Sequence, residues 1–540
     1  MGASRNKTWR VLVTIACLAL LLGLPLPHID SDAVLSGEVA KNILETGDWL
    51  TLHFPANYHP DLIVDKPPLT FWVMAISMRL GGQNNAVLRI GSLLFTILLV
   101  LTVYTIARRD LREDEALMAA LIVATFLQIF YSSALVPQHD MLITLFITLA
   151  FHAYLRYRQD GAGWWTALAG LWTGLAVLTK GVLLLPLVVS IAIVDALVAW
   201  WSGERPIVRF RHLVGGAVVF ALVAAPWYIL EVIRVGSPFV RVMLIDAGSI
   251  GRLRHSFLGP GLVPTRGFLA LLVAYVPLLL IGMLPWTGLL PGAVREGWRS
   301  LRVGPPAVRL CAVWFALYFL VLSVSQGDRI ARYLLPCYPP LAVLAGRSLT
   351  GPLDGRTRLQ AVTFVGPLFG VGLLGVGIWV ASRSFPREMY FYTPMLLPVL
   401  IALGLAALAS WALAARARGR EAIAVLAAGA LLSYAVTYAM ILQRWNQLWP
   451  WPAIGAAVNR LYHPGDMVVV VGVHEVEANF AAYWIRATLE PVDESAFRDA
   501  WRHRRVFALL APDQLAHLSD SPPPIVLVRT PLGWGLVTNR

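Results

Sequence analysis

An aspartate and a lysine stand side by side at Asp65 and Lys66, directly before two prolines. A helix that begins at Pro67 would offer free backbone N–H groups beside them, and such groups favour anions. We therefore interpret this pair as a seat for a phosphate. The alternative for Lys66 is an ordinary lysine that reaches toward the membrane surface, but the chain has only four lysines against 40 arginines.

Two more acids, Asp30 and Asp32, follow directly on the first apolar segment. A carboxylate at that point would lie at the membrane surface, where a general base could meet a lipid-borne substrate. The same side chains could instead cap the helix that follows them. Their position alone leaves both interpretations open.

Ionisable residues also stand at the ends of later apolar segments. Asp140 opens one such segment and Lys180 closes the next. Charged residues at these positions are candidates for function when they face the interior of a helix bundle, although solvated or paired end charges fit equally well.

A compact group further along contains Asp328, Arg329, Arg332 and Tyr333. Arginine suits phosphate oxygens because its guanidinium can bind them through two hydrogen bonds at once. An interfacial anchor, with Arg and Tyr at the lipid headgroups, is the alternative. The group is a second candidate for phosphate binding.

Histidine and cysteine do not indicate a metal site. His53, His59, His139 and His255 are all expected on the outer side, but no two of them have ligand spacing within one helix. The three cysteines lie in or beside apolar segments, so neither a disulfide framework nor a zinc ribbon fits. We assign no metal and no other cofactor, and a divalent metal stays an open alternative.

The composition places these residues in a membrane protein. Of the 540 residues, 58% are hydrophobic and 14% are charged, which is more apolar surface than one soluble core could bury. The sequence predicts a polytopic α-helical protein with about thirteen transmembrane helices, since a span of about 30 Å takes roughly 20 apolar residues. The apolar segments lie near 9–27, 86–107, 115–135, 139–157, 163–179, 181–201, 212–234, 266–290, 308–325, 331–350, 360–382, 392–415 and 421–441.

Arginine sets the orientation and explains most of the formal net charge of +13. Lys and Arg should collect in cytoplasmic loops, and they do collect in every second loop if the N-terminus is cytoplasmic. Because topology accounts for the positive charge, the charge does not indicate a nucleic-acid partner. The basic loops hold Arg108, Arg109, Arg112, Arg156, Arg158, Arg205, Arg209, Arg211, Arg295, Arg299, Arg302, Arg347, Arg356, Arg358, Arg416, Arg418 and Arg420.

Two outer segments remain outside this bundle. The first outer loop, residues 28–85, is long and charged, and the apolar spacing in Val34–Leu44 and Pro67–Leu80 predicts two amphipathic helices at the interface. Residues 442–540 form an outer tail, and from Met467 it alternates short β-branched and helical pieces. The sequence therefore predicts a transmembrane domain over 1–441 and a small soluble α/β domain over 442–540.

The order of several short strings resembles the C-type membrane glycosyltransferases, in the branch of lipid A aminoarabinose transferase and bacterial relatives of protein O-mannosyltransferases. The resemblance covers most of the chain, including its thirteen predicted spans and outer C-terminal domain. It depends on Asp32 followed by Glu38–Leu44 and Gly47-Asp48-Trp49, on Asp65–Leu69, on Leu178–Gly181, and on Arg332–Leu341.

The resemblance implies a sugar donor carried on a polyprenyl phosphate. Asp32 would be the general base near the acceptor, and Asp140 a second acid in the same cavity. Lys66 would bind the donor phosphate with Tyr333 and with Arg329 or Arg252, supported by Asp65, Lys180 and Arg332. The acceptor would attack the anomeric carbon from the face opposite the phosphate, so that the transfer inverts the configuration.

Three positions depart from the aminoarabinose branch. Ala33 follows Asp32 where an acid is common, Asp65 stands in place of glutamate, and Ser249 occupies the position of a metal-binding histidine. These departures leave the sugar and a zinc site open.

The resulting expectation is a glycosyltransferase in the bacterial cytoplasmic membrane, surrounded by membrane lipids, with its site on the periplasmic side. Its acceptor would be a lipid A-like lipid or a glycan of the envelope, with a protein Ser or Thr as the alternative. A transporter of lipid or solute is the competing class, because many helices with buried charges also describe transporters. The long first loop and the absence of paired repeats count against it.

Overall fold

The computed structural model describes most of the chain. The described residues are 2–26, 31–54, 64–134, 139–182, 184–204, 209–245, 268–325, 330–349, 366–384, 386–416, 418–448, 451–471, 483–485, 487, 489–492, 494–510, 514–515, 522–529 and 535–540.

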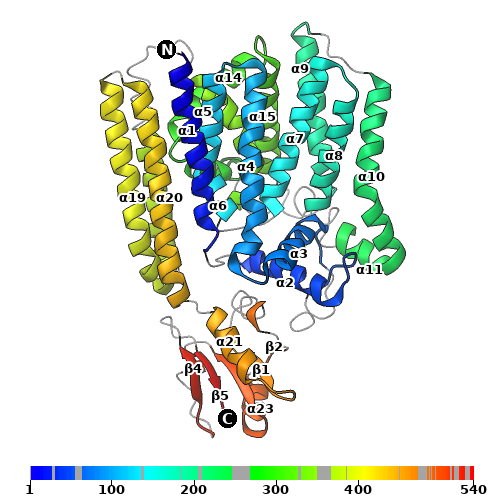
Figure 1. Ribbon diagram of the computed structural model, residues 1–540, viewed down its shortest axis with the longest axis vertical. Helices are drawn as coiled ribbons and strands as arrows, with labels where there is room; N and C mark the ends of the chain where they lie inside the picture. Colours follow the sequence, from blue (N-terminus) through cyan, green and yellow to red (C-terminus); the bar gives the residue numbers. More distant parts are fainter. Residues whose placement is uncertain are drawn as a thin grey trace.

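A bundle of long helices stands above a smaller unit that contains a β-sheet (Figure 1). Within the described part, six helices are long and apolar enough to cross a membrane, or up to eight if two bent pairs each form one span. This is the architecture of a multi-pass membrane protein, and the number of thirteen spans stays a prediction. The six helices are α1 (Gly2–Leu20), α4 (Asn85–Asp110), α9 (Leu184–Trp201), α10 (Phe210–Val235), α15 (Pro306–Val324) and α20 (Gly419–Leu448).

The bundle has two ends that matter below. We call the end next to the β-sheet the site end, and the other end, where α1 begins, the far end (Figure 1). The remaining long helices run between them. They are α7 (His139–Asp160), α8 (Trp164–Lys180), α18 (Gly366–Ser384) and α19 (Pro386–Ala415), with shorter elements η1 (Leu21–Gly23), α11 (Ser237–Val240), η2 (Arg241–Ile245), η5 (Ala331–Cys337) and α16 (Tyr338–Ser348).

The segment near 115–135, expected as one straight span, is two helices. Helices α5 (Glu113–Thr125) and α6 (Leu127–Ala134) meet at an angle of 55°. Neighbours bind the backbone groups that the break sets free: Leu127 N donates to Leu284 O at 2.9 Å, and the Tyr434 hydroxyl donates to Thr125 O at 2.9 Å. A break inside a membrane is tolerated when its polar groups are satisfied in this way.

The segment near 266–290 also differs from the straight span expected for it. Helix α13 (Phe268–Gly282) ends at its glycine, and the chain then turns by 114° into η4 (Thr287–Leu289) and α14 (Leu290–Ser300). Pro285 and Pro291 fall in this turn region, where proline cannot donate a helical hydrogen bond. The segment therefore makes a sharp turn and does not continue as one straight span.

The two helices expected within residues 28–85 are present. They are α2 (Ser31–Thr46) and α3 (Leu69–Gly81), and both lie across the site end of the bundle (Figure 1). Hydrogen bonds tie the described parts of the connecting chain together, since Val64 N donates to Leu52 O at 3.0 Å and Trp72 Nε1 donates to Trp49 O at 2.7 Å. Helices α2 and α3 therefore form a platform at the site end.

The C-terminal sheet unit, residues 451–540, contains five described strands in the order β2-β1-β3-β5-β4. The strands are β1 (Met467–Val471), β2 (Leu489–Pro491), β3 (Val506–Leu510), β4 (Ile525–Arg529) and β5 (Gly535–Thr538). Strands β1, β2 and β3 are parallel, whereas β5 runs antiparallel to both β3 and β4. Helices α21 (Trp451–Leu461) and α23 (Glu494–His503) complete the unit, and the domain boundary at 442 stays a prediction.

The sheet unit packs on α2 through a shared apolar core. Val39 and Ile43 of α2 belong to the same buried cluster as Ile454 and Val468 of the sheet unit. Gly37 lies so close to this contact that a Cβ there would come within 3.1 Å of the Tyr483 ring. The helix that carries Asp32 is therefore positioned from both sides, by the bundle and by the sheet unit.

Candidate active site

Asp140 is the centre of a charged group at the site end. It lies in the first turn of α7, and its side chain is 8% exposed. Its Oδ1 atom pairs with Lys180 Nζ, and its Oδ2 atom lies 3.4 Å from Arg332 Nε. One carboxylate therefore holds two cations, which leaves the group with an excess of positive charge.

The ring of Tyr333 joins this group. Lys180 Nζ lies 4.4 Å from the centre of the ring, within the range of a cation–π contact. We call Asp140, Lys180, Arg332 and Tyr333 the cation cluster. All four were site candidates in the sequence, and they come from three elements, α7, α8 and η5.

Local sequence explains how the cluster is presented. Helix α8 ends at Lys180 because Gly181 takes a φ of +104°, a conformation that favours glycine. A cation in the last turn of a helix is also stabilised by the helix dipole. In η5, the buried side chains of Leu334 and Leu335 anchor the turn that carries Arg332 and Tyr333.

Asp65 and Lys66 form a second part of the site. Their charged atoms lie 3.8 Å apart, and the two side chains are 28% and 37% exposed. The pair directly precedes α3, whose Phe71 ring lies 5.2 Å from the His139 ring at the start of α7, edge on at 74°. The beginning of α3 thus lies beside the beginning of α7, and Lys66 is accessible at the same end of the bundle as the cation cluster.

Helix α10 fixes the loop after α2. Arg234 pairs with Asp48 at 2.7 Å, and the Thr51 hydroxyl donates to Glu231 at 3.0 Å. Burial raises the pKa of Asp48, but hydrogen bonds from Arg234 and from the backbone of Leu50 and Thr51 outweigh it and leave the pKa below its ordinary value. The carboxylate therefore stays ionised and keeps the loop in place.

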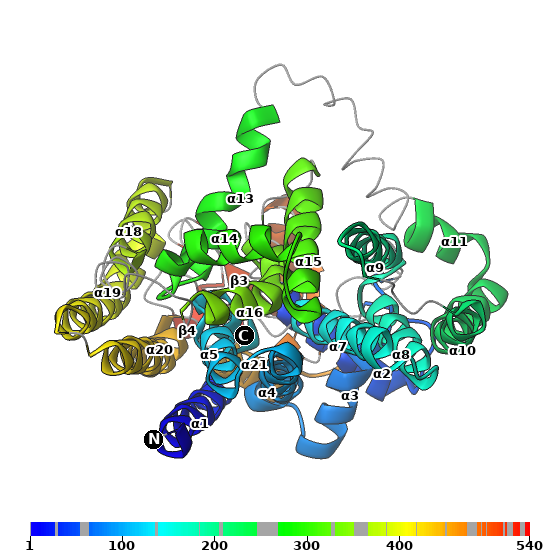
Figure 2. The ribbon, with the colours of Figure 1, turned by 90° about the horizontal axis from the view of Figure 1, so that it is seen from above.

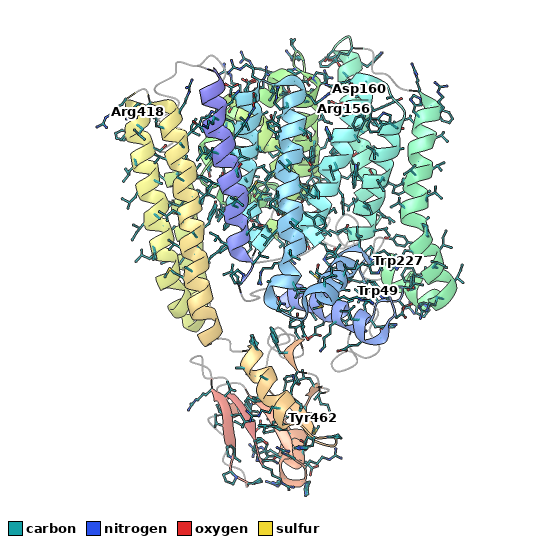
Figure 3. The ribbon with its side chains drawn as sticks, in the orientation of Figure 1. Trp49, Arg156, Asp160, Trp227, Arg418 and Tyr462 are labelled. Carbon is teal, nitrogen blue, oxygen red and sulfur yellow. The ribbon has the colours of Figure 1, made fainter. Side chains whose placement is uncertain are left out.

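A tryptophan completes this attachment. Trp227 Nε1 donates to Leu50 O at 3.1 Å, and Figure 3 shows Trp227 and Trp49 together at the site end. Gly47-Asp48-Trp49, one of the strings that carry the family resemblance, thus forms a fixed loop beside α10.

Several predicted residues lie outside this description. Asp32 is in the first turn of α2, but its side chain lies outside the described part. Arg252 and Arg329 lie wholly outside the described residues, as do Asp30, Asp328, His59, Ser249 and His255. Their roles stay predictions.

Glu38 was not singled out by sequence reasoning as a site residue, yet its environment is unusual. It is 1% exposed, and neither carboxylate oxygen has a hydrogen-bond partner within the described structure. Burial raises its pKa to about 8, so the group is largely protonated near neutral pH. Its position next to Val39 gave no signal, because segments distant in the chain, such as Tyr483 of the sheet unit, contribute to its environment.

The described residues contain no group of three or more His, Cys, Asp or Glu that could hold a metal ion. Of the four histidines considered from the sequence, only His53 and His139 are described, and His139 packs its ring against Phe71. The arrangement is suited instead to an anion: Lys66, Lys180 and Arg332 provide positive charge at one end of the bundle, next to a helix start.

The chain is similar to known membrane glycosyltransferases. Residues 65–229 match the family described as Dolichyl-phosphate-mannose-protein mannosyltransferase. The chain is 31% identical over 348 residues to an undecaprenyl phosphate-alpha-4-amino-4-deoxy-L-arabinose arabinosyl transferase of Aeromonas salmonicida, covering 63% of this chain and 59% of that protein. It is 30% identical over 445 residues to a protein of the same name from Pseudomonas aeruginosa, covering 80% and 75%.

The fold has a counterpart among solved structures. ArnT from Cupriavidus metallidurans bound to undecaprenyl phosphate superposes with a TM-score of 0.75 at 19% identity, over 98% of this chain and 97% of that one. The sequence alignments are shorter than this superposition. The chain spans 58–63% of the length of three aminoarabinose transferase relatives, the Aeromonas salmonicida protein among them.

Proposed function

Because the chain belongs to the family of undecaprenyl phosphate-alpha-4-amino-4-deoxy-L-arabinose arabinosyl transferases, we propose that it transfers a sugar from a polyprenyl-phosphate donor to an acceptor in the bacterial envelope. The observation that carries the proposal is the cation cluster, in which one buried acid holds Lys180 and Arg332. An excess of positive charge beside an accessible lysine is what a phosphate leaving group requires.

The donor phosphate binds between Lys66 and the cation cluster. Lys66 contributes its ammonium from the loop before α3, and Tyr333 can donate its hydroxyl to a phosphate oxygen. Arg329 and Arg252 are further phosphate ligands in this proposal, carried over from the sequence. The charge that grows on the phosphate as the sugar departs is stabilised by these cations, which are already in place.

Asp140 positions the cations in this scheme. Its carboxylate is nearly buried and bonded on both oxygens, so it is poorly placed to take a proton from an acceptor. The acceptor's proton goes to Asp32, which lies at the start of α2. The acceptor oxygen then attacks the anomeric carbon opposite the phosphate, and the configuration inverts. No cofactor enters this scheme, and no step passes through a metal.

The orientation follows from charge. Figure 3 places Arg156 and Arg418 at the far end, away from the sheet unit, and the basic loops predicted as cytoplasmic include both. Under the positive-inside rule the far end faces the cytoplasm and the site end faces the periplasm, in the inner membrane. A periplasmic site has no ready supply of nucleotide sugars, which agrees with a lipid-linked donor.

The names of the relatives favour 4-amino-4-deoxy-L-arabinose as the sugar on undecaprenyl phosphate. The acceptor in this proposal, lipid A or a similar envelope lipid or glycan, is carried over from the resemblance in the sequence. The family match over residues 65–229 carries a protein-mannosyltransferase description, so a protein acceptor is the second candidate. Mass spectrometry of lipid A, envelope glycans and surface proteins, with and without the gene, separates the two by showing which fraction loses a sugar mass.

The test of the site uses purified protein in proteoliposomes with an undecaprenyl-phosphate-linked sugar and lipid A. We expect Lys66→Ala and Asp32→Asn each to lower the transfer rate by about 10²–10³, the usual cost of removing one preorganised charge or donor. Lys41→Ala is the matched control, because Lys41 lies on the same platform but pairs only with Glu45 among the described carboxylates. Wild-type rates for Lys66→Ala and Asp32→Asn would show that the site is assigned wrongly.

A further inference from the structure

A cavity of about 380 Å³ lies among α7, α8, α9 and α10, at one edge of the bundle. Figure 2 shows these four helices grouped on that side of the molecule. The walls are almost entirely apolar and include Ala169, Val188, Ala192, Leu213 and Phe220. This space takes no part in the site described above.

The cavity opens toward lipid. Val189 of α9 and Leu213 of α10 line it, yet they are 44% and 47% exposed. Both belong to helices that are apolar enough to cross a membrane. The exposed sides of these residues therefore face hydrocarbon, and a membrane lipid can enter between α9 and α10.

The length of the cavity matches one leaflet. Its lining on α9 runs from Leu185, next to the site-end start of that helix, to Ala196, which at 1.5 Å per residue is about 16 Å, or about half of a hydrocarbon core of about 30 Å. On α10 the lining runs only from Leu213 to Phe220, in the half nearer the far end. One acyl chain that descends from the far-end surface fits this space.

Most polar groups at the far end of the cavity are already bonded, and the Nε atom of Arg158 is the exception. Tyr154 donates to Ala192 O at 3.0 Å, and Tyr157 accepts from the backbone of Arg209 at 3.0 Å. Arg158 pairs with Asp195 and with Glu204. A polar ligand would gain nothing by displacing these contacts, whereas a hydrocarbon chain needs none of them.

Two arginines lie near the far-end opening of the cavity. Arg209 and Arg211 are exposed, and in the described part of the chain neither has an ion-pair partner. The backbone of Arg209 is bonded to Tyr157, which lines the cavity, and Leu213 lines it a few residues further along. Basic residues at the end of a membrane helix attract anionic headgroups.

We propose that this cavity binds one anionic phospholipid of the far-end leaflet, with an acyl chain between α9 and α10 and its phosphate at Arg209 and Arg211. The polyprenyl donor is a poorer occupant, because its phosphate belongs at Lys66 and the cation cluster, at the opposite end of the bundle. The bound lipid braces α9 and α10 against α7 and α8, the two helices that carry Asp140 and Lys180.

Native mass spectrometry of the full-length protein, titrated with phosphatidylglycerol or phosphatidylcholine, tests the site. Ala192→Phe fills the cavity and should abolish one tightly held phosphatidylglycerol. Arg209→Gln combined with Arg211→Gln should weaken phosphatidylglycerol binding about fivefold per arginine and leave phosphatidylcholine unchanged. The arginine variant tests the site even where Ala192→Phe yields no folded protein, because both arginines are exposed.

The controls lie outside the cavity. Val218→Phe changes an exposed position of α10 that does not line it, and Arg416→Gln with Arg420→Gln removes the same charge from the hairpin of α19 and α20. Both controls should keep the wild-type lipid. Equal retention by Ala192→Phe and wild type, or an equal effect of the arginine variant on both lipids, would overturn the proposal. So would undecaprenyl phosphate occupying the place that Ala192→Phe removes.

Discussion

Two groups of charges lie at opposite ends of the same helices, and they are built differently. At the site end, one acid faces two cations, and the Lys180 and Arg332 side chains keep 23% and 18% of their surface exposed. At the far end, Asp195 and Glu204 face Arg158 and Arg309, so charges balance, and three of these four side chains are at most 6% exposed. A balanced and closed group holds helices together, whereas an unbalanced and accessible one is ready for a charged ligand.

The far-end group joins elements that are distant in the chain. Arg309 of α15 donates to Glu204 at 2.6 and 2.7 Å, and Tyr154 of α7 donates to Asp195 of α9 at 3.0 Å. Buried charges that lose one partner are strongly destabilising, because the remaining charge stays away from water. The two groups should therefore respond to mutation in opposite ways.

The largest effect is expected at the closed group. Arg309→Met leaves Asp195 and Glu204 with one arginine, and we expect it to destabilise the protein by about 3–5 kcal/mol. The measurement is the Tm of the purified protein in detergent. The far-end surface pair of Arg418 and Glu421 is the control, since Arg418→Met should hardly move the Tm. A Tm for Arg309→Met equal to wild type would mean that the group does not hold the helices.

The second largest effect is expected at the cation cluster, which is the accessible group. Lys180→Met should lower the transfer rate by about 10²–10³, or about 2.7–4 kcal/mol of transition-state stabilisation, while the Tm changes little because Asp140 keeps Arg332. The rate is measured in proteoliposomes and the Tm in parallel. If Lys180→Met lost stability as Arg309→Met does, and kept its rate, the contrast between the two groups would fail.

Glu38 gives a smaller effect with a definite sign. Its pKa is about 8 in the folded protein against 4.5 ordinarily, so between these values the folded state binds more protons than the unfolded state. Stability should therefore fall as pH rises through this window, by up to about 1.4 kcal/mol per pH unit. Glu38→Gln should remove that part of the dependence in Tm scans from pH 5 to pH 8. Glu45→Gln, which changes a 59% exposed side chain on the same helix, should leave most of it, because burial rather than the charge of Glu45 is the main cause of the raised pKa of Glu38.

The smallest effect concerns the loop after α2. The pair of Asp48 and Arg234 is 25% and 50% exposed, and such pairs contribute about 0.2–1 kcal/mol. A double-mutant cycle with Asp48→Asn and Arg234→Gln, followed by Tm, should give a coupling in that range. A coupling above 3 kcal/mol would place this pair with the closed group instead.

Part of the site could be predicted because helical hairpins obey simple geometry. Asp140 begins one predicted span and Lys180 ends the next, so both must lie at the same membrane surface, and neighbouring antiparallel helices bring such ends together. The approach of Arg332 to Asp140 could not be read in this way, because it depends on how η5 returns to α7 from nearly two hundred residues away.

The bend between α5 and α6 had no sequence signal either. The break falls at Phe126, with neither glycine nor proline beside it. It is stabilised by Tyr434 of α20 and by Leu284 and Trp286, which bind Thr125 and Leu127. The burial of Glu38 is similar, since α2 packs against segments distant in the chain, the sheet unit among them. Local spacing predicts elements, whereas contacts from distant segments decide how they are bent and buried.

The contact between α2 and the sheet unit determines when, during synthesis, the platform can be fixed. Gln83, just after α3, donates to the backbone of Tyr483, 400 residues later, and Tyr483 also packs against Gly37. At about 5–20 residues per second, a ribosome needs about 20–80 s to travel between the two. The segment that carries Asp32 and Lys66 is thus made well before Tyr483 and gains this contact only once the sheet unit has been made, so the platform of α2 and α3 stays incomplete during that interval.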